Sequence, residues 1–273
     1  MELNCYKINP TGNVTLIVEG AVPVEQQAAL AAELMKRDTE AEQVGFLSKP
    51  QRFGSAAALR MMGGEFCGNA AISAAALVMD SHGAKNGEKA SVRLEISGAD
   101  EPLNVETVKL SDGLYSGTLL MPLPTACFDC ELMSFGERTV LPMVRLPGIS
   151  HIIVHDEIGV DKAERVIRDW CRQTDSEALG LMFTDDENGL LRPLVYVEKT
   201  DSLVWESSCA SGSVAVCAYR AMKSGTAQEL RLRQPGGVLS VSADYSNGVL
   251  WGVKLSGRAE IVGRYSLETV EAT

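Results

Sequence analysis

Two stretches of the chain repeat the same unusual order of residues about half a chain apart. Residues 65–72 read EFCGNAAI, and residues 206–216 read ESSCASGSVAV. In each, a cysteine follows an acidic residue and precedes a polar, glycine-containing step and an alanine-rich run typical of a buried helix. This repetition predicts two similar lobes, each with a cysteine at a helix N-terminus, and a boundary near residues 122–135.

Apolar periodicity and turn residues predict an α+β protein with few helices and many, mainly antiparallel, strands. The expected helices are 24–37, 68–81, 161–173 and 210–224. Gly83 and Gly225 follow the second and fourth, where glycine favours a left-handed cap. Runs of β-formers bounded by Gly, Pro, Asp, Asn or Ser predict strands at 3–8, 14–19, 92–96, 117–121, 138–144, 152–155, 191–197, 230–233, 238–243 and 250–255.

Charge and hydropathy exclude several classes of partner. The net charge is −11, so a nucleic-acid backbone is not expected to bind. No run approaches the ~20 apolar residues of a membrane span, and the N-terminus lacks the pattern of a signal peptide. We therefore expect a cytoplasmic protein whose seven cysteines are mostly reduced and that binds a small molecule.

The two cysteines suggest a specific chemistry. A helix N-terminus carries unpaired N–H groups and partial positive charge, so it favours a thiolate and also binds carboxylates. Two such sites could hold a small carboxylate substrate with one sulfur on either side. In a two-base racemisation one thiolate removes the Cα proton and the opposing thiol protonates the other face. Taken alone, either cysteine could instead be a small buried residue.

Several motifs together resemble the diaminopimelate epimerase superfamily of cofactor-independent amino-acid racemases. They are EFCGNAA, WESSCASGSVAV and the later RQPGGVLSVSADYSNGVLWGVKLSGRAEIVGR. The likeness spans the chain and includes NPTGN (9–13), EQVGF (42–46) and the histidine in GISHIIV (148–154). Within the superfamily the sequence most resembles bacterial histidine racemases of metallophore biosynthesis.

The resemblance implies a fold, a mechanism and a set of site residues. It implies two pseudo-symmetric lobes, 1–125 and 126–273, each an antiparallel sheet or barrel curled around a central helix, with the final strands packing back on the first lobe. It implies Cys67 and Cys209 as opposed bases, without pyridoxal phosphate or metal. The substrate-binding residues that it implies are Asn13, Gly68, Asn69, Ala210, Ser211 and Gly212. Dimers are common in the superfamily, so a homodimer is expected.

The sequence also departs from the diaminopimelate epimerases. Those enzymes carry Asn-Pro before the histidine that matches His151, where this chain has Ile149 and Ser150. They also carry a Glu-Arg pair before the second cysteine, where this chain has Glu206 and no arginine. A cationic or imidazole side chain therefore suits the site better than a second carboxylate, with Glu42 and Glu206 as acidic partners. Histidine is the expected substrate, and diaminopimelate or another amino acid is the alternative.

Other readings of the sequence remain open. A non-racemising isomerase of the phenazine-biosynthesis type would share the fold, but the cysteine pair argues against it. A non-catalytic amino-acid-binding protein would leave two reactive thiols without a purpose. Cys127 and Cys130 form a Cys-x-x-Cys, but no histidine has metal-site spacing to them, and we interpret the pair as structural. His151 could make a structural hydrogen bond or a substrate contact.

Overall fold

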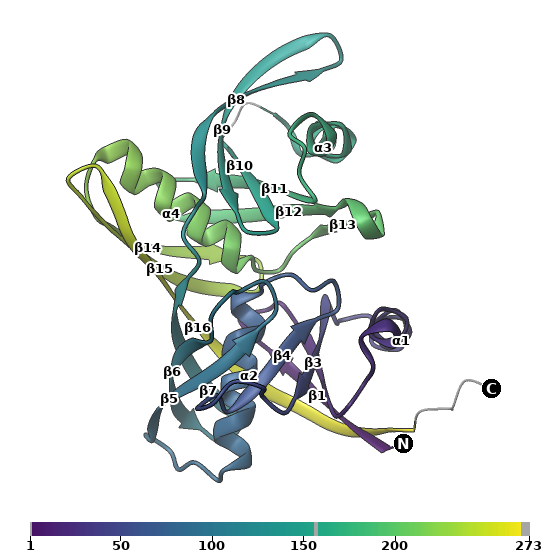
Figure 1. The fold of residues 1–273 in the computed structure, drawn as a ribbon. Coiled ribbons are helices and arrows are strands. Elements are labelled where there is room, and N and C mark those ends of the chain that lie inside the picture. The colour runs from purple at the N-terminus through teal and green to yellow at the C-terminus, as the bar shows by residue number, and fades with distance from the viewer. Residues whose placement is uncertain (1, 156–157, 269–273) are drawn as a thin grey trace. The chain divides into compact units, whose positions relative to one another are not determined.

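A computed structural model describes residues 2–155 and 158–268, and they form two compact units (Figure 1). Unit 1 comprises Met1–Leu120 and Ser256–Thr273, and unit 2 comprises Met121–Leu255. The helices are α1 (Val24–Arg37), α2 (Gly68–Ser81), α3 (Val160–Gln173) and α4 (Ala210–Ser224), with a short 3-10 helix, η1 (Glu198–Thr200). Among the described residues, no helix combines the length and apolar composition that a membrane span requires.

Unit 1 contains a closed barrel of eight strands. Its strands are β1 (Glu2–Asn9), β2 (Thr15–Glu19), β3 (Gln43–Ser48), β4 (Ala57–Met61), β5 (Lys89–Ile96), β6 (Leu103–Ser111), β7 (Leu114–Met121) and the C-terminal part of β16 (Val249–Glu268). They pair in this order, and β16 then pairs antiparallel with β1. Figure 1 shows this closure, in which the yellow end of β16 runs beside the purple β1.

Helix α2 lies within the curve of these strands, and its sequence explains why it fits there. Almost every residue of α2 is buried, and many of them are alanines, whose short side chains keep the helix thin. Gly117 of β7 allows a close approach, since a Cβ at this position would lie 2.7 Å from Ile72 Cγ2. The body of α2 is therefore held by packing, and this fixes the position of its N-terminus.

Unit 2 is a curved sheet with α4 packed against it. Its strands are β8 (Ala126–Ser134), β9 (Glu137–Leu146), β10 (Ile149–Val154), β11 (Ala178–Asp185), β12 (Leu190–Val197), β13 (Ser202–Trp205), β14 (Gln228–Gln234), β15 (Gly237–Ser246) and the first part of β16. Helix α4 contacts β9, β10, β11, β14 and β15, and its C-terminus is capped by Gly225 at φ 73°. Helix α3 buries Trp170 in a separate apolar cluster with Ile152, Leu181 and Leu194.

The α+β class, all four helices and the mainly antiparallel pairing are confirmed, but the implied purely antiparallel sheets are wrong. Four pairings are parallel: β2 with β3, β4 with β5, β10 with β11, and β12 with β14. Each joins strands separated in the chain by a helix, and a crossover of this kind brings the second strand back in the same direction. The ten predicted strands are present, while β3, β4, β6, β8, β11 and β13 were not predicted.

Candidate functional site

Cys67 is the N-cap residue of α2. Its backbone is extended (φ −133°, ψ 112°), and its Sγ accepts a hydrogen bond from the Ala70 N–H at 3.4 Å. This N–H belongs to the first turn, whose donors have no partner within the helix. Cys67 is partly exposed, whereas Gly68 and Asn69 directly after it are buried. The thiol is therefore accessible at the end of an otherwise buried helix.

A chain of polar side chains leads from Cys67 into unit 1. Cys67 Sγ donates to Gln43 Oε1 at 3.3 Å, and Gln43 Nε2 donates to Asn13 Oδ1 at 2.6 Å. Asn13 Nδ2 in turn donates to the Glu42 carboxylate at 2.5 Å, and Asn69 Nδ2 reaches Asn13 Oδ1 at 3.4 Å. Three of the predicted substrate-binding residues, Asn13, Glu42 and Asn69, thus belong to one network that ends on Cys67.

Cys209 occupies the equivalent position at the start of α4. Its backbone is extended (φ −118°, ψ 111°), and Gly212 N–H donates to its Sγ at 3.4 Å. Ser211 Oγ lies 3.5 Å from the same sulfur. The Cys209 N–H donates to Gln234 Oε1 at 2.7 Å, and Gln234 Nε2 donates to Ser213 Oγ at 2.9 Å. Gln234 therefore holds the Cys209 backbone N–H and the Ser213 side chain of the first turn of α4.

The environment of Cys209 favours its protonated form. Burial raises the pKa of this thiol well above its usual value, and the charge and hydrogen bond of the Glu206 carboxylate raise it further. The Ser211 hydroxyl and the Gly212 N–H act in the opposite direction. In this state Cys209 holds its proton next to a carboxylate that could accept it.

His151 of β10 contacts the same helix start through Ser211. Its Nε2 lies 2.9 Å from Ser211 Oγ, and its side chain is fully buried. Burial lowers its pKa to about 3, so the ring is neutral at physiological pH. Within the described residues, Nδ1 has no hydrogen-bond partner, and it faces Gly180, where a Cβ would lie only 2.4 Å away. Glycine at 180 is therefore what makes room for the ring.

The predicted site residues fall into two groups, one in each unit. Cys67, Asn13, Glu42, Gly68 and Asn69 lie at the start of α2 and beside it, and Cys209, Glu206, Ala210, Ser211 and Gly212 lie at the start of α4.

Sequence reasoning assigned no role to Gln43 or Gln234. Gln43 lies in EQVGF and Gln234 in the segment that begins RQPGG, and membership of these two motifs was the available signal.

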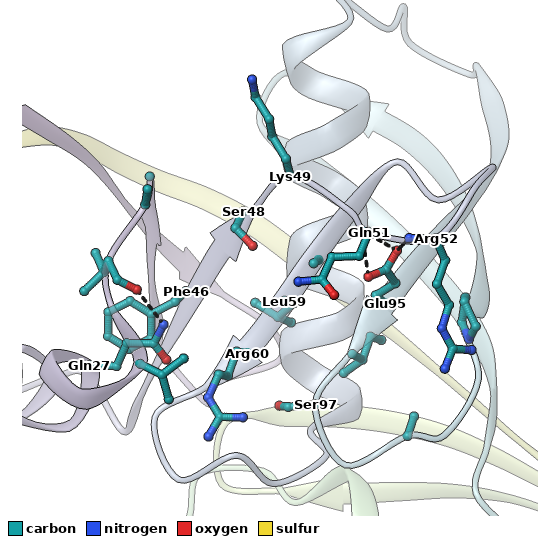
Figure 2. Close-up of a pocket in the computed structure, with 18 of the residues that line it drawn as sticks. Gln27, Phe46, Ser48, Lys49, Gln51, Arg52, Leu59, Arg60, Glu95 and Ser97 are labelled. Carbon is teal, nitrogen blue, oxygen red and sulfur yellow. Dashed lines mark hydrogen bonds between the residues drawn. The ribbon is translucent and has the colours of Figure 1, made fainter.

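Two further features lie apart from these groups. Cys127 and Cys130 lie on β8, and burial raises the pKa of both. In residues 2–155 and 158–268 no cluster of three or more His, Cys, Asp or Glu side chains could hold a metal. Unit 1 also has a cavity of about 480 Å³, which none of the residues of the Cys67 network lines. Figure 2 shows residues that do line it, including Arg52, Arg60 and Glu95.

Comparison with known proteins gives matches along nearly the whole chain. The profile of the family described as histidine racemase CntK N-terminal domain matches residues 2–266. A histidine racemase of Fusobacterium nucleatum subsp. nucleatum is 31% identical over 243 residues, which cover 87% of this chain and 88% of the relative.

Solved structures with low sequence identity show the same fold. A phenazine biosynthesis protein of the PhzF family from Bacillus anthracis has a TM-score of 0.70 at 15% identity. The match covers 98% of this chain and 100% of the Bacillus anthracis chain. A hydroxyproline epimerase from Agrobacterium vitis, solved with trans-4-hydroxy-L-proline bound, has a TM-score of 0.70 at 14% identity, with 97% and 91% covered.

Proposed function

The chain belongs to the histidine racemase CntK family, and from that premise we propose that it interconverts L- and D-histidine without pyridoxal phosphate. The observation that carries the proposal is the paired cysteines. Cys67 and Cys209 each cap a buried, small-residue helix, and each sulfur receives a backbone N–H at 3.4 Å. An enzyme that inverts Cα with two bases needs two such groups.

We propose that Cys67 and Cys209 act on opposite faces of the substrate Cα. The α-proton of an amino acid is weakly acidic, so the carboxylate must be stabilised as negative charge develops on it. The backbone N–H groups of the two helix starts, at Gly68 and Asn69 and at Ala210, Ser211 and Gly212, are suited to bind that carboxylate. This assignment implies a diaminopimelate epimerase-like fold.

The base is generated next to Glu206. When the Cys209 thiol passes its proton to this carboxylate, the resulting thiolate can remove the Cα proton. Cys67 then delivers its S–H proton to the other face. For the opposite enantiomer the roles are exchanged, so each sulfur acts once as acid and once as base.

We propose that the acidic residues also select the substrate side chain. Asn13 and Glu42 would face the amino-acid head and the imidazole, and they are connected to Cys67 through Gln43. An imidazole can donate a hydrogen bond to a carboxylate, whereas a second substrate carboxylate would be repelled by it.

Cytoplasmic conditions would suit this enzyme, because all seven cysteines are free thiols in the structure.

The direct test is proton exchange in deuterated water. Purified protein is incubated with L-histidine and a panel of other amino acids, including diaminopimelate, and the Cα deuterium and the D-enantiomer are measured. We expect exchange and inversion of histidine, and losses of about 10²–10⁴-fold in Cys67→Ser and Cys209→Ser. Binding without exchange would identify a binding protein. Faster turnover of diaminopimelate than of histidine would show that diaminopimelate is the preferred substrate.

A further inference from the structure

We infer that Glu42, acting through Asn13 and Gln43, holds Cys67 as a neutral thiol in the free protein, so that Cys67 is the resting proton donor and Cys209 with Glu206 supplies the base. The first half concerns Cys67 alone. The second half rests on the proposed racemase function, because it assigns a direction to the proton transfer.

The orientation of each amide follows from its neighbours. The Glu42 carboxylate has only acceptor atoms, so the group that Asn13 turns towards it at 2.5 Å must be its NH₂. The carbonyl Oδ1 of Asn13 then faces Gln43, which must offer its own NH₂ at 2.6 Å. The Gln43 carbonyl is consequently the end that faces Cys67 Sγ at 3.3 Å.

Thr15 fixes Gln43 independently. The Thr15 hydroxyl donates its hydrogen to the Asn13 backbone carbonyl at 3.0 Å, so towards Gln43 it can only accept. Gln43 Nε2 donates to this Thr15 Oγ1 at 2.7 Å. Two acceptors therefore hold the same end of the Gln43 amide, and its carbonyl is locked towards the sulfur.

A carbonyl oxygen at this distance stabilises the S–H form of the cysteine and opposes the thiolate. The Ala70 N–H on the other side of Sγ, at 3.4 Å, acts in the opposite direction. Two other charged side chains of this segment, Glu65 and Arg60, lie next to the glycines that precede Cys67. Glu65 Oε2 would lie 2.5 Å from a Cβ at Gly63, and an Arg60 guanidinium nitrogen would lie 3.1 Å from one at Gly64.

The consequence for catalysis is a defined starting state. In the free enzyme Cys67 carries a proton that it can give to Cα, and the Cys209 thiol can give its proton to Glu206 and become the base. After one inversion Cys67 has lost its proton and Cys209 has gained the proton from Cα. In this form Cys67 is the base for the opposite enantiomer. Without such a turnover, water returns one proton from the Cys209–Glu206 pair to Cys67 and restores the starting state.

The test is alkylation of each cysteine by iodoacetamide as a function of pH, without substrate, read peptide by peptide by mass spectrometry. Gln43→Met removes the carbonyl while keeping the length of the side chain. We expect the alkylation midpoint of Cys67 to fall by about one pH unit, which is about a tenfold higher thiolate fraction near pH 7, with Cys209 unchanged. Glu42→Gln should shift the Cys67 midpoint in the same direction by less, because Asn13 can then turn over and loosen Gln43, which Thr15 still holds.

Gln51→Met is the matched control, because it makes the same exchange in unit 1 away from the network and should leave Cys67 unchanged. An unchanged or higher Cys67 midpoint in folded Gln43→Met would overturn the inference, as would the same result in Glu42→Gln if Gln43→Met does not fold. The measurement needs no turnover. Shifted midpoints in a protein that does not racemise histidine would refute the proposed function and leave the Cys67 assignment intact.

Discussion

Replacing Gly180 with alanine should disturb the Cys209 site indirectly, through His151. Gly180 lies on β11 beside His151, and a Cβ there would lie 2.4 Å from His151 Nδ1 and 2.7 Å from Met182 Cε. Ordinary van der Waals contact begins near 3.4 Å, so the imidazole must move by about 1 Å. The ring is fully buried, so its neighbours must move with it.

The displacement reaches Cys209 through one hydrogen bond. His151 Nε2 and Ser211 Oγ are 2.9 Å apart, and a shift of about 1 Å along this line takes the pair outside hydrogen-bonding range, so Ser211 must move or lose its partner. Ser211 Oγ is 3.5 Å from the Cys209 sulfur. We expect overpacking to cost about 1–3 kcal/mol and the misplaced site to lower kcat by about 10–100-fold.

Two measurements on Gly180→Ala check this reasoning. Thermal unfolding should show a Tm about 2–4 °C lower for each kcal/mol lost, and histidine racemisation should show the loss in kcat. Gly263→Ala is the control, because its Cβ would meet only Lys7 Cβ at 4.0 Å. Wild-type Tm and kcat in Gly180→Ala would refute the claim that the glycine makes room for the ring.

Three further predictions follow from the titrating groups. Burial lowers the pKa of His151 to about 3, so the unfolded state binds a proton more readily than the native state. The free energy of unfolding should therefore be full above pH 6.5 and should fall by about 1.4 kcal/mol per pH unit as pH drops towards 3. Urea denaturation should show a shallower fall in His151→Asn. Burial raises the pKa of Cys171 to about 11 and of Cys217 to about 12. The free energy of unfolding should therefore be full below about pH 8.5 and should decline above it, less steeply in Cys217→Val. A flat alkaline profile would contradict this. Glu206→Gln should lower the pKa of Cys209 and speed its alkylation at pH 8, and slower labelling would show that Glu206 does not oppose the thiolate.

The helices could be predicted from sequence because their signals are local. The alanine-rich runs after Cys67 and Cys209 are bounded by turn residues, and the positive φ of Gly83 and Gly225 matches the glycine stops. Strand β11, ALGLMFTD, was missed because a strand buried on both faces shows no alternation of apolar and polar residues. The parallel pairings were missed for a different reason, since direction depends on which strands a helix connects.

The site was only partly predictable. The two cysteine motifs point to helix starts, and the structure has both cysteines as N-caps. Gln43 and Gln234 were not assigned, because a glutamine at a strand end reads as a polar surface residue unless its partner is known. Their partners, Cys67 and the Cys209 N–H, lie 24 and 25 residues away in sequence, so only the fold brings them together.

The closing strand of the unit 1 barrel has a consequence for synthesis of the chain on the ribosome. Unit 2, Met121–Leu255, is continuous in sequence, so all of its residues have emerged before the barrel can close. Until the end of β16 follows, β1 and β7 each present an unpaired edge, and unpaired edges are prone to join other chains. The N-terminal unit, although made first, must therefore be the last to complete its fold, and its first strand has to be kept from wrong partners until the last strand arrives.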